Sequence, residues 1–434
     1  MLALDAGLLV AAGLDWFLTP APKRCIVERT VPETVGLSNR FERRTRLRFD
    51  PPTSRPLEVE VHEEFPPAFE VCARTGRGGL EELSGAAGVA GDSGDPSGGP
   101  DLAVLKDGEV EIVRIYRSHV RGVHRLGDLR LRIRGPLGLV ERQRRLYGSQ
   151  HVAVEPALTN LKQTLRLAAS ERWFDLGVRK LRRRGGRTEF ESLRDYVQGD
   201  DPRHVDWKAF ARRGKPTVRQ FQEERGQELI LVVDCGRRMR ATTVRGRRRG
   251  WTKLDWALDA ALQLAAVALS KGDRVGAAAF DQRIHVFVAP ARSSRQLARL
   301  NGALFHLQPG EGASDLERAL RELAVRHRRR ALVIVLSDVA DPFSVDHQRR
   351  ALAAASKRHR LIFAALDDPS VRSAAAGEDV SAAERAAALE LVEDRRLALR
   401  RLAVIGVRVL DALPAEAAGP LLAAWLDERR SFRG

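Results

Sequence analysis

Two uninterrupted apolar runs, each ending in an aspartate, constrain the fold of this chain more than any other feature. They are ELILVVD (Glu228–Asp234) and ALVIVLSD (Ala331–Asp338). A strand that is apolar on both faces must be covered on both faces, which is typical of parallel sheets. Helical patterns separate these runs from each other and from the later strand patterns LIFAALD and VIGVRVLD. The alternation predicts an α/β domain with a doubly wound parallel sheet over residues 228–434.

The helical pattern after the first run is KLDWALDAALQLAAVALSKG (Lys253–Gly272). Its leucines recur every four residues, at Leu254, Leu258 and Leu262, so we expect one apolar face against the sheet. Gly272 is a suitable stop for this helix.

In the N-terminal part, the spacing of apolar residues differs from that of the C-terminal part. Apolar and polar residues alternate in short runs that Pro and Gly interrupt, which predicts an antiparallel β-sandwich over residues 24–150. Within it, residues 77–100 are rich in Gly, Ser and Asp and lack any apolar periodicity, so we expect a disordered loop there. The strand-like runs are CIVERTVP, RTRLRF, LEVEVHEEFP, EIVRIYRSHV and LRLRIRGPLGLV. The chain is thus expected to combine an all-β part with an α/β part.

Residues 1–20 are the only candidate for a membrane segment. Asp5 and Asp15 bracket an apolar centre, whereas a spanning helix needs about 20 mostly apolar residues. Lys23 and Arg24 follow, which would keep the downstream chain in the cytoplasm. We expect a weak anchor at the cytoplasmic face of the membrane. The alternatives are a buried helix in a cytoplasmic protein and the remnant of a longer hydrophobic region.

The basic charge of the chain has two interpretations, an acidic partner or compositional drift toward Arg and Ala. The formal net charge is +17, and between Arg179 and Gly250 there are 21 Lys/Arg against 10 Asp/Glu. Residues 155–227 are expected to form a basic linker, which could contact a protein, an anionic membrane surface or a nucleic acid, or be a solvated surface. Nucleic acid is the least favoured partner, because few aromatic residues stand between the basic runs for base stacking.

Motifs for catalysis are scarce in this sequence. It has no G-x-S-x-G elbow, no P-loop and no G-x-G-x-x-G after the first apolar strand, and its three cysteines are far apart. We therefore expect a protein that is not an enzyme. A hydrolase of an unrecognised kind is the remaining alternative, and its only support is an acidic cluster.

That cluster is expected at the carboxyl edge of the parallel sheet, where open α/β sheets bind ligands. Asp234 and Asp338 end the two apolar strands, and Ser314 lies in a Gly-containing turn before a helix. Three oxygen-bearing side chains on three loops at one edge of the sheet form a different kind of site from one for a dinucleotide or a Walker-type triphosphate.

This C-terminal region resembles a von Willebrand factor A-like domain. The resemblance implies a metal-ion-dependent adhesion site with Asp234, Ser314 and Asp338 as ligands of Mg²⁺. The two serines of the family's Asp-x-Ser-x-Ser motif are replaced by Gly236 and Arg238. Neither residue can ligate a cation. Arg238 could instead lie across Asp234 and Asp338 and take the place of the metal, so binding of Mg²⁺ is one alternative and a metal-free cluster the other.

A longer signature stands just upstream, RDYVQGDDPRHVDWKAFARRGKPTVRQFQEER. With it, the chain resembles the domain-of-unknown-function 58 family, whose bacterial and archaeal members often have N-terminal membrane segments and are commonly encoded beside a MoxR-type AAA+ ATPase. The match also includes Arg121-Gly122 and Pro136-Leu137-Gly138-Leu139. The signature residues are Arg194, Asp195, Tyr196, Gly199, Asp200, Asp201, Arg203, Asp206, Trp207 and Arg212.

The resemblance implies an adaptor that binds a MoxR-type ATPase and an unknown client protein. Asp234, Ser314 and Asp338 would meet an acidic loop of the partner, and without a metal Arg238 would make that contact. The signature itself has two interpretations: a salt-bridged clasp between linker and α/β domain, or a docking surface with Trp207 as an anchor. The alternative function is binding of a membrane surface or nucleic acid through the basic linker.

Overall fold

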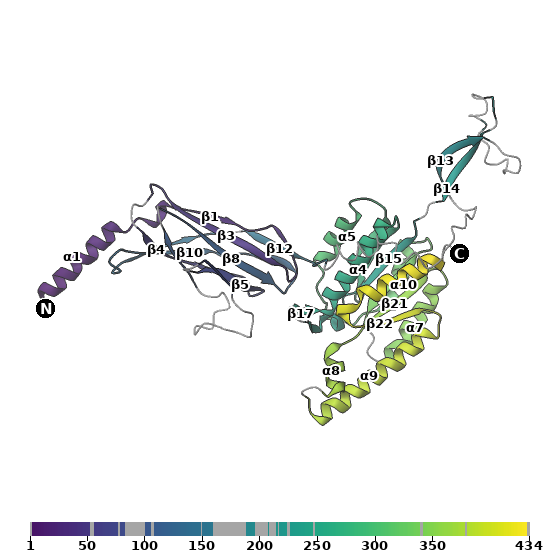
Figure 1. Ribbon diagram of the computed structural model, residues 1–434. Helices are drawn as coiled ribbons and strands as arrows, with labels where there is room; N and C mark the ends of the chain where they lie inside the picture. Colours follow the sequence, from purple (N-terminus) through teal and green to yellow (C-terminus); the bar gives the residue numbers. More distant parts are fainter. Residues whose placement is uncertain are drawn as a thin grey trace.

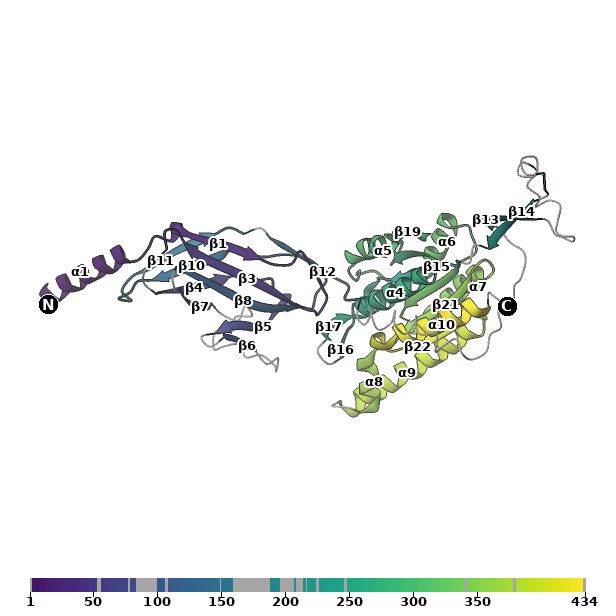
Figure 2. The same ribbon diagram turned by 45° about the horizontal axis from the view of Figure 1, so that its top comes forward.

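The structure is a computed structural model in which a β-rich part is followed by an α/β part, as Figures 1 and 2 show. It describes residues 2–52, 56–76, 79–82, 100–105, 108–148, 150–158, 188–195, 207, 214–215, 217–223, 226–245, 248–338, 342–377 and 380–431. Most of the basic linker and of the family signature lies outside these residues, and so does most of the expected loop over residues 77–100.

The β-rich part consists of sheets that are antiparallel except for one pair of strands. Side chains of the two larger sheets meet in a shared core that includes Leu47, Phe49, Val59, Val61 and Ile133. A smaller sheet joins β2 (Thr34–Gly36), β12 (His151–Glu155) and β9 (Gly122–Arg125), and its β2 and β12 are parallel. The five-stranded sheet has the order β1 (Cys25–Thr30), β3 (Arg40–Phe49), β8 (Glu109–Ser118), β5 (Phe69–Gly76) and β6 (Gly79–Glu82). The four-stranded sheet has the order β11 (Glu141–Leu146), β10 (Leu129–Arg134), β4 (Leu57–Glu63) and β7 (Asp101–Leu105).

The alternating sequence pattern is confirmed in these strands. Along β3 and β10 every second residue is buried and the intervening residues are exposed. One expectation needs correction: Gly79–Glu82 forms strand β6 and pairs with β5, so part of the segment expected to be disordered is in a sheet. The β-rich part also extends to Glu155, the last residue of β12.

The N-terminal helix α1 (Leu2–Leu18) projects from the far end of the β-rich part (Figure 1). Asp15 is buried near its C-terminal end, and its carboxylate accepts hydrogen bonds from the backbone N–H groups of Leu137, Leu139 and Val140, at 2.8–2.9 Å. One of the two aspartates that bracket the apolar centre therefore fixes the helix to a turn of the β-rich part. Among the described helices, none combines the length and the apolar character needed to cross a membrane.

The α/β part is built on a six-stranded sheet. Five strands are parallel, but β19 runs antiparallel at one edge, so the expectation of a purely parallel sheet is wrong. A short connection of three residues joins β18 to β19, and such a connection can only reverse the chain direction. The order is β19 (Ile284–Ala291), β18 (Arg274–Phe280), β15 (Glu228–Asp234), β20 (Leu332–Ser337), β21 (Arg360–Leu366) and β22 (Arg408–Ala412).

Helices cover both faces of this sheet, as the apolar strands require. On one face α4 (Lys253–Ser270), α5 (Gln296–Phe305) and α10 (Ala418–Ser431) pack on alternate strand residues such as Leu231. On the other face α6 (Leu316–Arg326), α7 (Pro342–Ser356) and α9 (Ala382–Ala403) pack on the intervening residues such as Val232. Helix α8 (Pro369–Ala376) follows β21. The leucines expected on one face of α4, Leu254, Leu258 and Leu262, pack in the core that includes Leu231, and burial extends over all residues from Lys253 to Ala268.

Two hairpins complete the described structure. Strands β13 (Thr188–Asp195) and β14 (Thr217–Glu223) pair with each other, and β16 (Thr242–Arg245) pairs with β17 (Arg248–Thr252). The second hairpin leads into α4 through Thr252. The hydroxyl of Thr252 accepts from the N–H of Asp255, and the Asp255 carboxylate accepts from the N–H of Thr252, which closes a capping box.

The β-rich and α/β parts share a buried contact at the start of α4. The rings of Trp251 and Trp256 belong to the same apolar cluster as Phe41 and Tyr116 of the β-rich part, and Trp251 Nε1 donates to Ser38 Oγ at 2.7 Å. The guanidinium of Arg121 donates to the Asp255 carboxylate and to the Phe305 carbonyl. Arg121, part of the family resemblance, thus joins the two parts.

A buried histidine at the opposite end of the sheet should make stability depend on pH. Burial, with the nearby His327 and Arg358, lowers the pKa of His359 from 6.5 to about 4. The unfolded chain therefore takes up this proton at a higher pH than the folded chain. The contribution of neutral His359 to the unfolding free energy is therefore complete above pH 6.5 and is lost as the pH falls toward 4. We expect His359→Gln to reduce the pH dependence of the unfolding free energy between pH 6.5 and 4, measured by urea titrations. His347→Gln, at an exposed histidine, should leave that pH dependence unchanged. Equal pH dependence in both variants would contradict this assignment.

Candidate functional site

The carboxyl edge of the sheet gathers the polar residues predicted from the sequence. Strands β15 and β20 are parallel neighbours, so Asp234 and Ser337 end side by side. The loop before α6 is fixed to the end of β15 by two backbone hydrogen bonds, from Gly310 N–H to the Cys235 carbonyl and from Arg237 N–H to the Gly312 carbonyl. This loop places the hydroxyl of Ser314 in contact with the carboxylate of Asp234.

The carboxylate of Asp234 is enclosed by hydrogen-bond donors. Its Oδ1 accepts from Ser314 Oγ and from the Gly236 N–H, and its Oδ2 accepts from Ser337 Oγ at 2.5 Å. Burial raises the pKa of Asp234, although the two serines and the Gly236 N–H oppose that effect. A Cβ at position 236 would lie 2.1 Å from Ser314 Oγ. Glycine at this position of the motif therefore makes room for the serine that closes the site.

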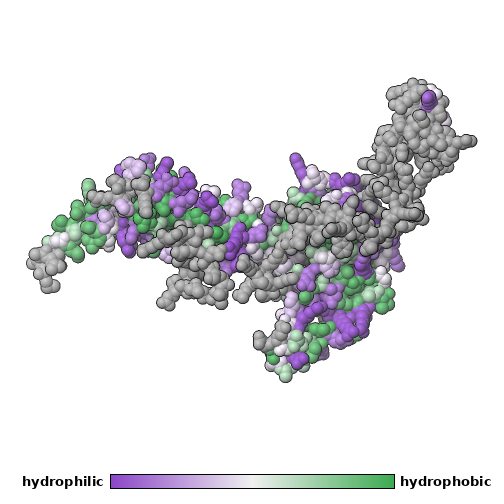
Figure 3. Space-filling model, viewed as in Figure 1, coloured by the Kyte–Doolittle hydropathy of each residue, from purple (hydrophilic) through white to green (hydrophobic). Residues whose placement is uncertain are grey.

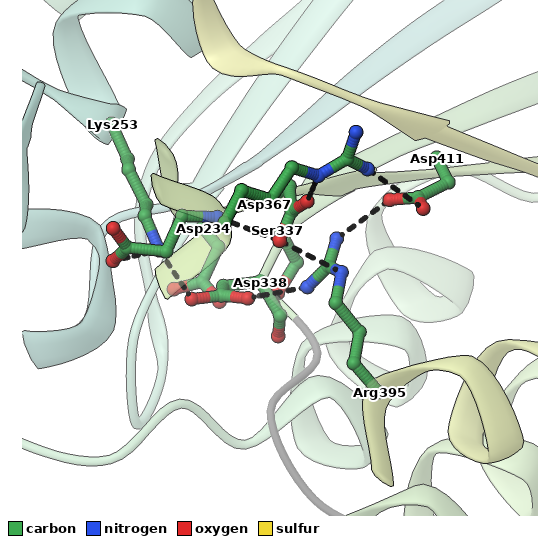
Figure 4. Close-up of polar contacts among 9 residues, drawn as sticks. Asp234, Lys253, Ser337, Asp338, Asp367, Arg395 and Asp411 are labelled. Carbon is green, nitrogen blue, oxygen red and sulfur yellow. Dashed lines mark hydrogen bonds and ion pairs between the residues drawn. The ribbon is translucent and has the colours of Figure 1, made fainter. Parts of the chain in front are cut away.

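Asp338 is held by two cations that the sequence analysis did not single out. Lys253 Nζ lies 2.9 Å from Asp338 Oδ2, and Arg395 Nη1 lies 3.0 Å from Asp338 Oδ1 (Figure 4). Both cations are more than nine-tenths buried. Lys253 is the first residue of α4, whose N-terminal end faces this edge of the sheet, and Arg395 reaches it from the middle of α9.

The same two cations extend the cluster to three further aspartates. Lys253 Nζ lies 3.0 Å from Asp368 Oδ2, and Arg395 contacts Asp367 at 3.2 Å and Asp411 at 3.0 Å. We call the set of Asp338, Asp367, Asp368, Asp411, Lys253 and Arg395 the carboxyl-edge network (Figure 4). Its geometry gives every carboxylate in it a charged partner.

Part of this network has a signal in the sequence. Asp367-Asp368 and Asp411 directly follow the apolar patterns of β21 and β22, just as Asp234 and Asp338 follow β15 and β20. A search for every carboxylate that follows an apolar strand would have found them. Lys253 and Arg395 have no such signal, because each lies on a helix and neither follows an apolar strand.

Arg238 lies in the single turn η4 (Arg237–Arg240) and is half-buried. The ion pairs of Asp338 within the described residues are made by Lys253 and Arg395, so these two cations stand where Arg238 was expected to neutralise this carboxylate. The neighbouring Cys235 is buried, and burial raises the pKa of its thiol to about 12. The thiol is therefore protonated at neutral pH and is a poor nucleophile.

The residues present do not fit a Mg²⁺ ion. Mg²⁺ requires oxygen ligands in near-octahedral geometry. Both carboxyl oxygens of Asp234 already accept hydrogen bonds, and both oxygens of Asp338 face protein cations that would repel a divalent ion. No group of three or more His, Cys, Asp or Glu side chains among the described residues is arranged to hold a metal ion.

We expect the stability of the chain to be indifferent to divalent cations. A ligand that binds only the folded state raises the unfolding midpoint by mass action. Because Lys253 and Arg395 already neutralise Asp338, millimolar Mg²⁺ and excess EDTA should give the same thermal midpoint in scanning fluorimetry. A saturable rise of the midpoint with Mg²⁺ would contradict the metal-free arrangement.

Of the family signature, the described residues contain Arg194 and Asp195, at the end of β13, and Trp207, whose side chain is exposed. The remaining signature residues lie outside the described residues, so neither the clasp nor the docking interpretation is tested. The Pro136–Leu139 segment is the turn that holds Asp15.

Comparison with known proteins finds a family model that includes all residues of this site except Asp411. Residues 192–402 match the family model described as "Protein of unknown function DUF58". A segment of 177 residues is 31% identical to uncharacterized proteins of Mycobacterium bovis and Mycobacterium tuberculosis, covering 40% of this chain and 53% of each relative. The chain thus spans about half the length of these curated relatives.

Two solved structures show only a remote likeness. The conserved hypothetical protein BatB from Bacteroides thetaiotaomicron aligns over 48% of this chain and 100% of its own, with 14% identity and a TM-score of 0.32. A conjugative transposon lipoprotein from Bacteroides eggerthii aligns over 28% of this chain and 94% of its own, with 12% identity and a TM-score of 0.17. Scores this low carry no argument about fold or function.

Proposed function

We propose that this chain is a non-enzymatic protein-interaction adaptor that works with a MoxR-type AAA+ ATPase in the assembly or maturation of a client protein. The finer resemblance to a von Willebrand factor A-like domain is part of the proposal. One observation carries it: the polar groups at the carboxyl edge of the sheet are engaged with one another. Asp234 is enclosed by two hydroxyls and an N–H, and Asp338 is paired with Lys253 and Arg395.

This arrangement suits recognition better than acid–base or nucleophilic chemistry. A catalytic acid or base must reach the proton that it transfers, and its pKa must lie near the working pH. Asp234 and Asp338 are buried and fully engaged, and the Cys235 thiol is protonated. A buried network with satisfied partners instead makes the loops above it rigid, and rigid loops lose little entropy when a partner binds.

The surface offered to a partner is the rim above Asp234. It is formed by the loop Gly310–Asp315 and the turn η4, which Arg240 and Glu311 join through an ion pair of 3.6 Å. Ala313 and Ser314 are exposed at its centre. In this proposal Arg238, on the same turn, meets an acidic loop of the partner.

The test is to purify the tagged full chain from its own host, with nuclease and mild detergent, and to identify what co-elutes. We expect a stoichiometric AAA+ ATPase that survives moderate salt. Ala313→Trp should abolish its co-elution, because the indole would fill the centre of the rim without removing an interior contact. Ala386→Trp, at an exposed position of α9, is the matched control. The adaptor proposal is contradicted if no AAA+ ATPase co-elutes, or if equal amounts of it co-elute with the two variants.

Association with a membrane surface is a second candidate, and helix α1 favours it. The side chains of Leu9, Val10 and Phe17 are 74%, 72% and 85% exposed. Successive residues of a helix point about 100° apart, so Leu9 and Val10 lie on different sides of α1. Figure 3 shows this hydrophobic surface at one end of the molecule. An interfacial helix buries apolar side chains of this kind at the boundary between lipid head groups and acyl chains.

Basic and aromatic groups at the base of α1 support the same candidate. The guanidinium of Arg142 lies 3.9 Å from the centre of the Trp16 ring, and Lys23 and Arg24 follow in η1 (Pro22–Arg24). Such groups are favoured at an anionic lipid interface. The chain would then sit at the cytoplasmic face of the membrane, attached through α1. The expected contact through the basic linker stays a prediction, since most of that linker lies outside the described residues.

Flotation with lipid vesicles tests this second candidate. The chain should float with vesicles that contain phosphatidylserine, and Phe17→Glu should reduce the floated fraction severalfold. Val325→Glu is the control, because Val325 is an apolar residue of α6 that is 73% exposed. The candidate fails if wild type stays at the bottom of the gradient or if both variants float alike.

A further inference from the structure

A recess beside the carboxyl-edge network shares Asp367, Asp411 and Arg395 with it and adds apolar and further basic residues. Its volume is about 720 Å³, within the range of small binding sites. It lies between α8, α9 and β22, and its apolar floor includes Val392, Leu399 and Val409. Four arginines and two aspartates line its sides: Arg372, Arg395, Arg396, Arg400, Asp367 and Asp411.

The four arginines fall into two pairs. Arg395 and Arg372 each contact both Asp367 and Asp411, so the charges of this pair are balanced inside the recess. The side chains of Arg396 and Arg400 are exposed at the rim. Arg396 has only an exposed pair with Glu393, at 3.6 Å, and Arg400 has no ion-pair partner within the described part of the chain. The surplus positive charge of the recess is therefore at its open side.

The recess is elongated along α9. Val392, Arg396, Leu399 and Ala403 follow one another at helical spacing and share one face of the helix. From Val392 to Ala403 this face extends over roughly 16 Å, at about 1.5 Å per residue. Strand β22 is the last strand of the sheet and forms the opposite wall through Val409 and Asp411.

We propose that this recess binds an acidic segment of a partner protein, with apolar side chains on its floor and carboxylates on Arg396 and Arg400. The inference rests on the proposed adaptor function and names the kind of partner sequence that it binds. Arg396 and Arg400 are one helical turn apart, so their charges match carboxylates at separate positions of a peptide better than a single anionic head group. Arg395 belongs both to the recess and to the carboxyl-edge network, so the network holds one wall of the recess in place.

The experiment presents an array of random 12-residue peptides to the full chain. Bound peptides should be enriched in Asp and Glu together with Leu, Ile and Val. The best of them, labelled with fluorescein, is then titrated in fluorescence anisotropy. We expect Arg400→Glu to weaken its binding about fivefold and the double variant Arg396→Glu/Arg400→Glu to weaken it by more than about tenfold, since charge reversal at a rim turns attraction into repulsion.

Arg401→Glu is the matched control, because Arg401 is exposed on the same helix, bears the same charge and does not line the recess. It should change the affinity less than about twofold. The inference is overturned if acidic peptides are not enriched or if Arg401→Glu weakens binding as much as Arg400→Glu. Dodecanoate, a small anionic amphiphile, is titrated in parallel. If dodecanoate binds in an Arg400-dependent way and no peptide does, the inference is overturned as well.

The two proposals can fail separately. If the AAA+ ATPase co-elutes equally with wild type and with the double variant, the adaptor function stands and the recess is not its peptide site. If wild type recovers no ATPase but binds acidic peptides through Arg400, the recess stands as a binding site and the ATPase is the wrong partner.

Discussion

Lys253→Met is expected to lower the unfolding free energy of the α/β part by about 3–5 kcal/mol, the range found when one partner of a buried ion pair is removed. Lys253 Nζ lies between Asp338 and Asp368, at 2.9 and 3.0 Å. Methionine fills a similar volume without the charge, so Asp338 would keep only Arg395 as a cation. The measurement is a urea titration followed by far-ultraviolet circular dichroism.

Lys357→Met is the control for this result, because Lys357 is an exposed lysine of the same domain. It should change the unfolding free energy by less than about 0.5 kcal/mol. A loss below about 1 kcal/mol for Lys253→Met would mean that the ammonium group contributes no more than an exposed charge. The carboxyl-edge network would then not be what makes the rim above Asp234 rigid.

Arg121→Met should uncouple the β-rich part from the α/β part. The Arg121 guanidinium pairs with the buried Asp255 carboxylate and donates to the Phe305 carbonyl, and the Arg121 carbonyl accepts from Gln308. Without the guanidinium, Asp255 is left as a buried charge beside Trp256, at a cost of about 3–5 kcal/mol. We expect one thermal transition in calorimetry for the wild type and two for Arg121→Met, with faster protease cleavage between the two parts in the variant.

Arg130→Met is the control, because Arg130 pairs with Glu64 on the surface, with both side chains about half exposed. It should cost less than about 1 kcal/mol and leave the transition undivided. If Arg121→Met also leaves one transition at an unchanged temperature, the apolar contact of Trp251 and Trp256 is sufficient to hold the two parts together.

The alternation of apolar strands with helices predicted the α/β part because burial on both faces leaves few other solutions. We did not predict that β19 is antiparallel, although the sequence contains the reason: the three residues between β18 and β19 are too few for the crossover that a parallel neighbour needs. The attachment of α1, in contrast, could not be predicted. The composition of α1 indicated an apolar helix, but the hydrogen bonds from Leu137, Leu139 and Val140 to Asp15 depend on a turn more than 120 residues away.

The sequence by itself determined where the carboxylates of the candidate site would be. Parallel strands place their carboxyl ends at one edge, so Asp234 and Asp338 were expected at the same edge, and the structure shows that their strands are neighbours there. Only the tertiary structure decided what balances them. Arg395 is 57 residues from Asp338 in the chain, and Lys253 is 85 residues from it. The two side chains reach the carboxylates only when helices α4 and α9 have packed on opposite faces of the sheet. No local sequence pattern encodes that packing, so the sequence did not reveal these partners.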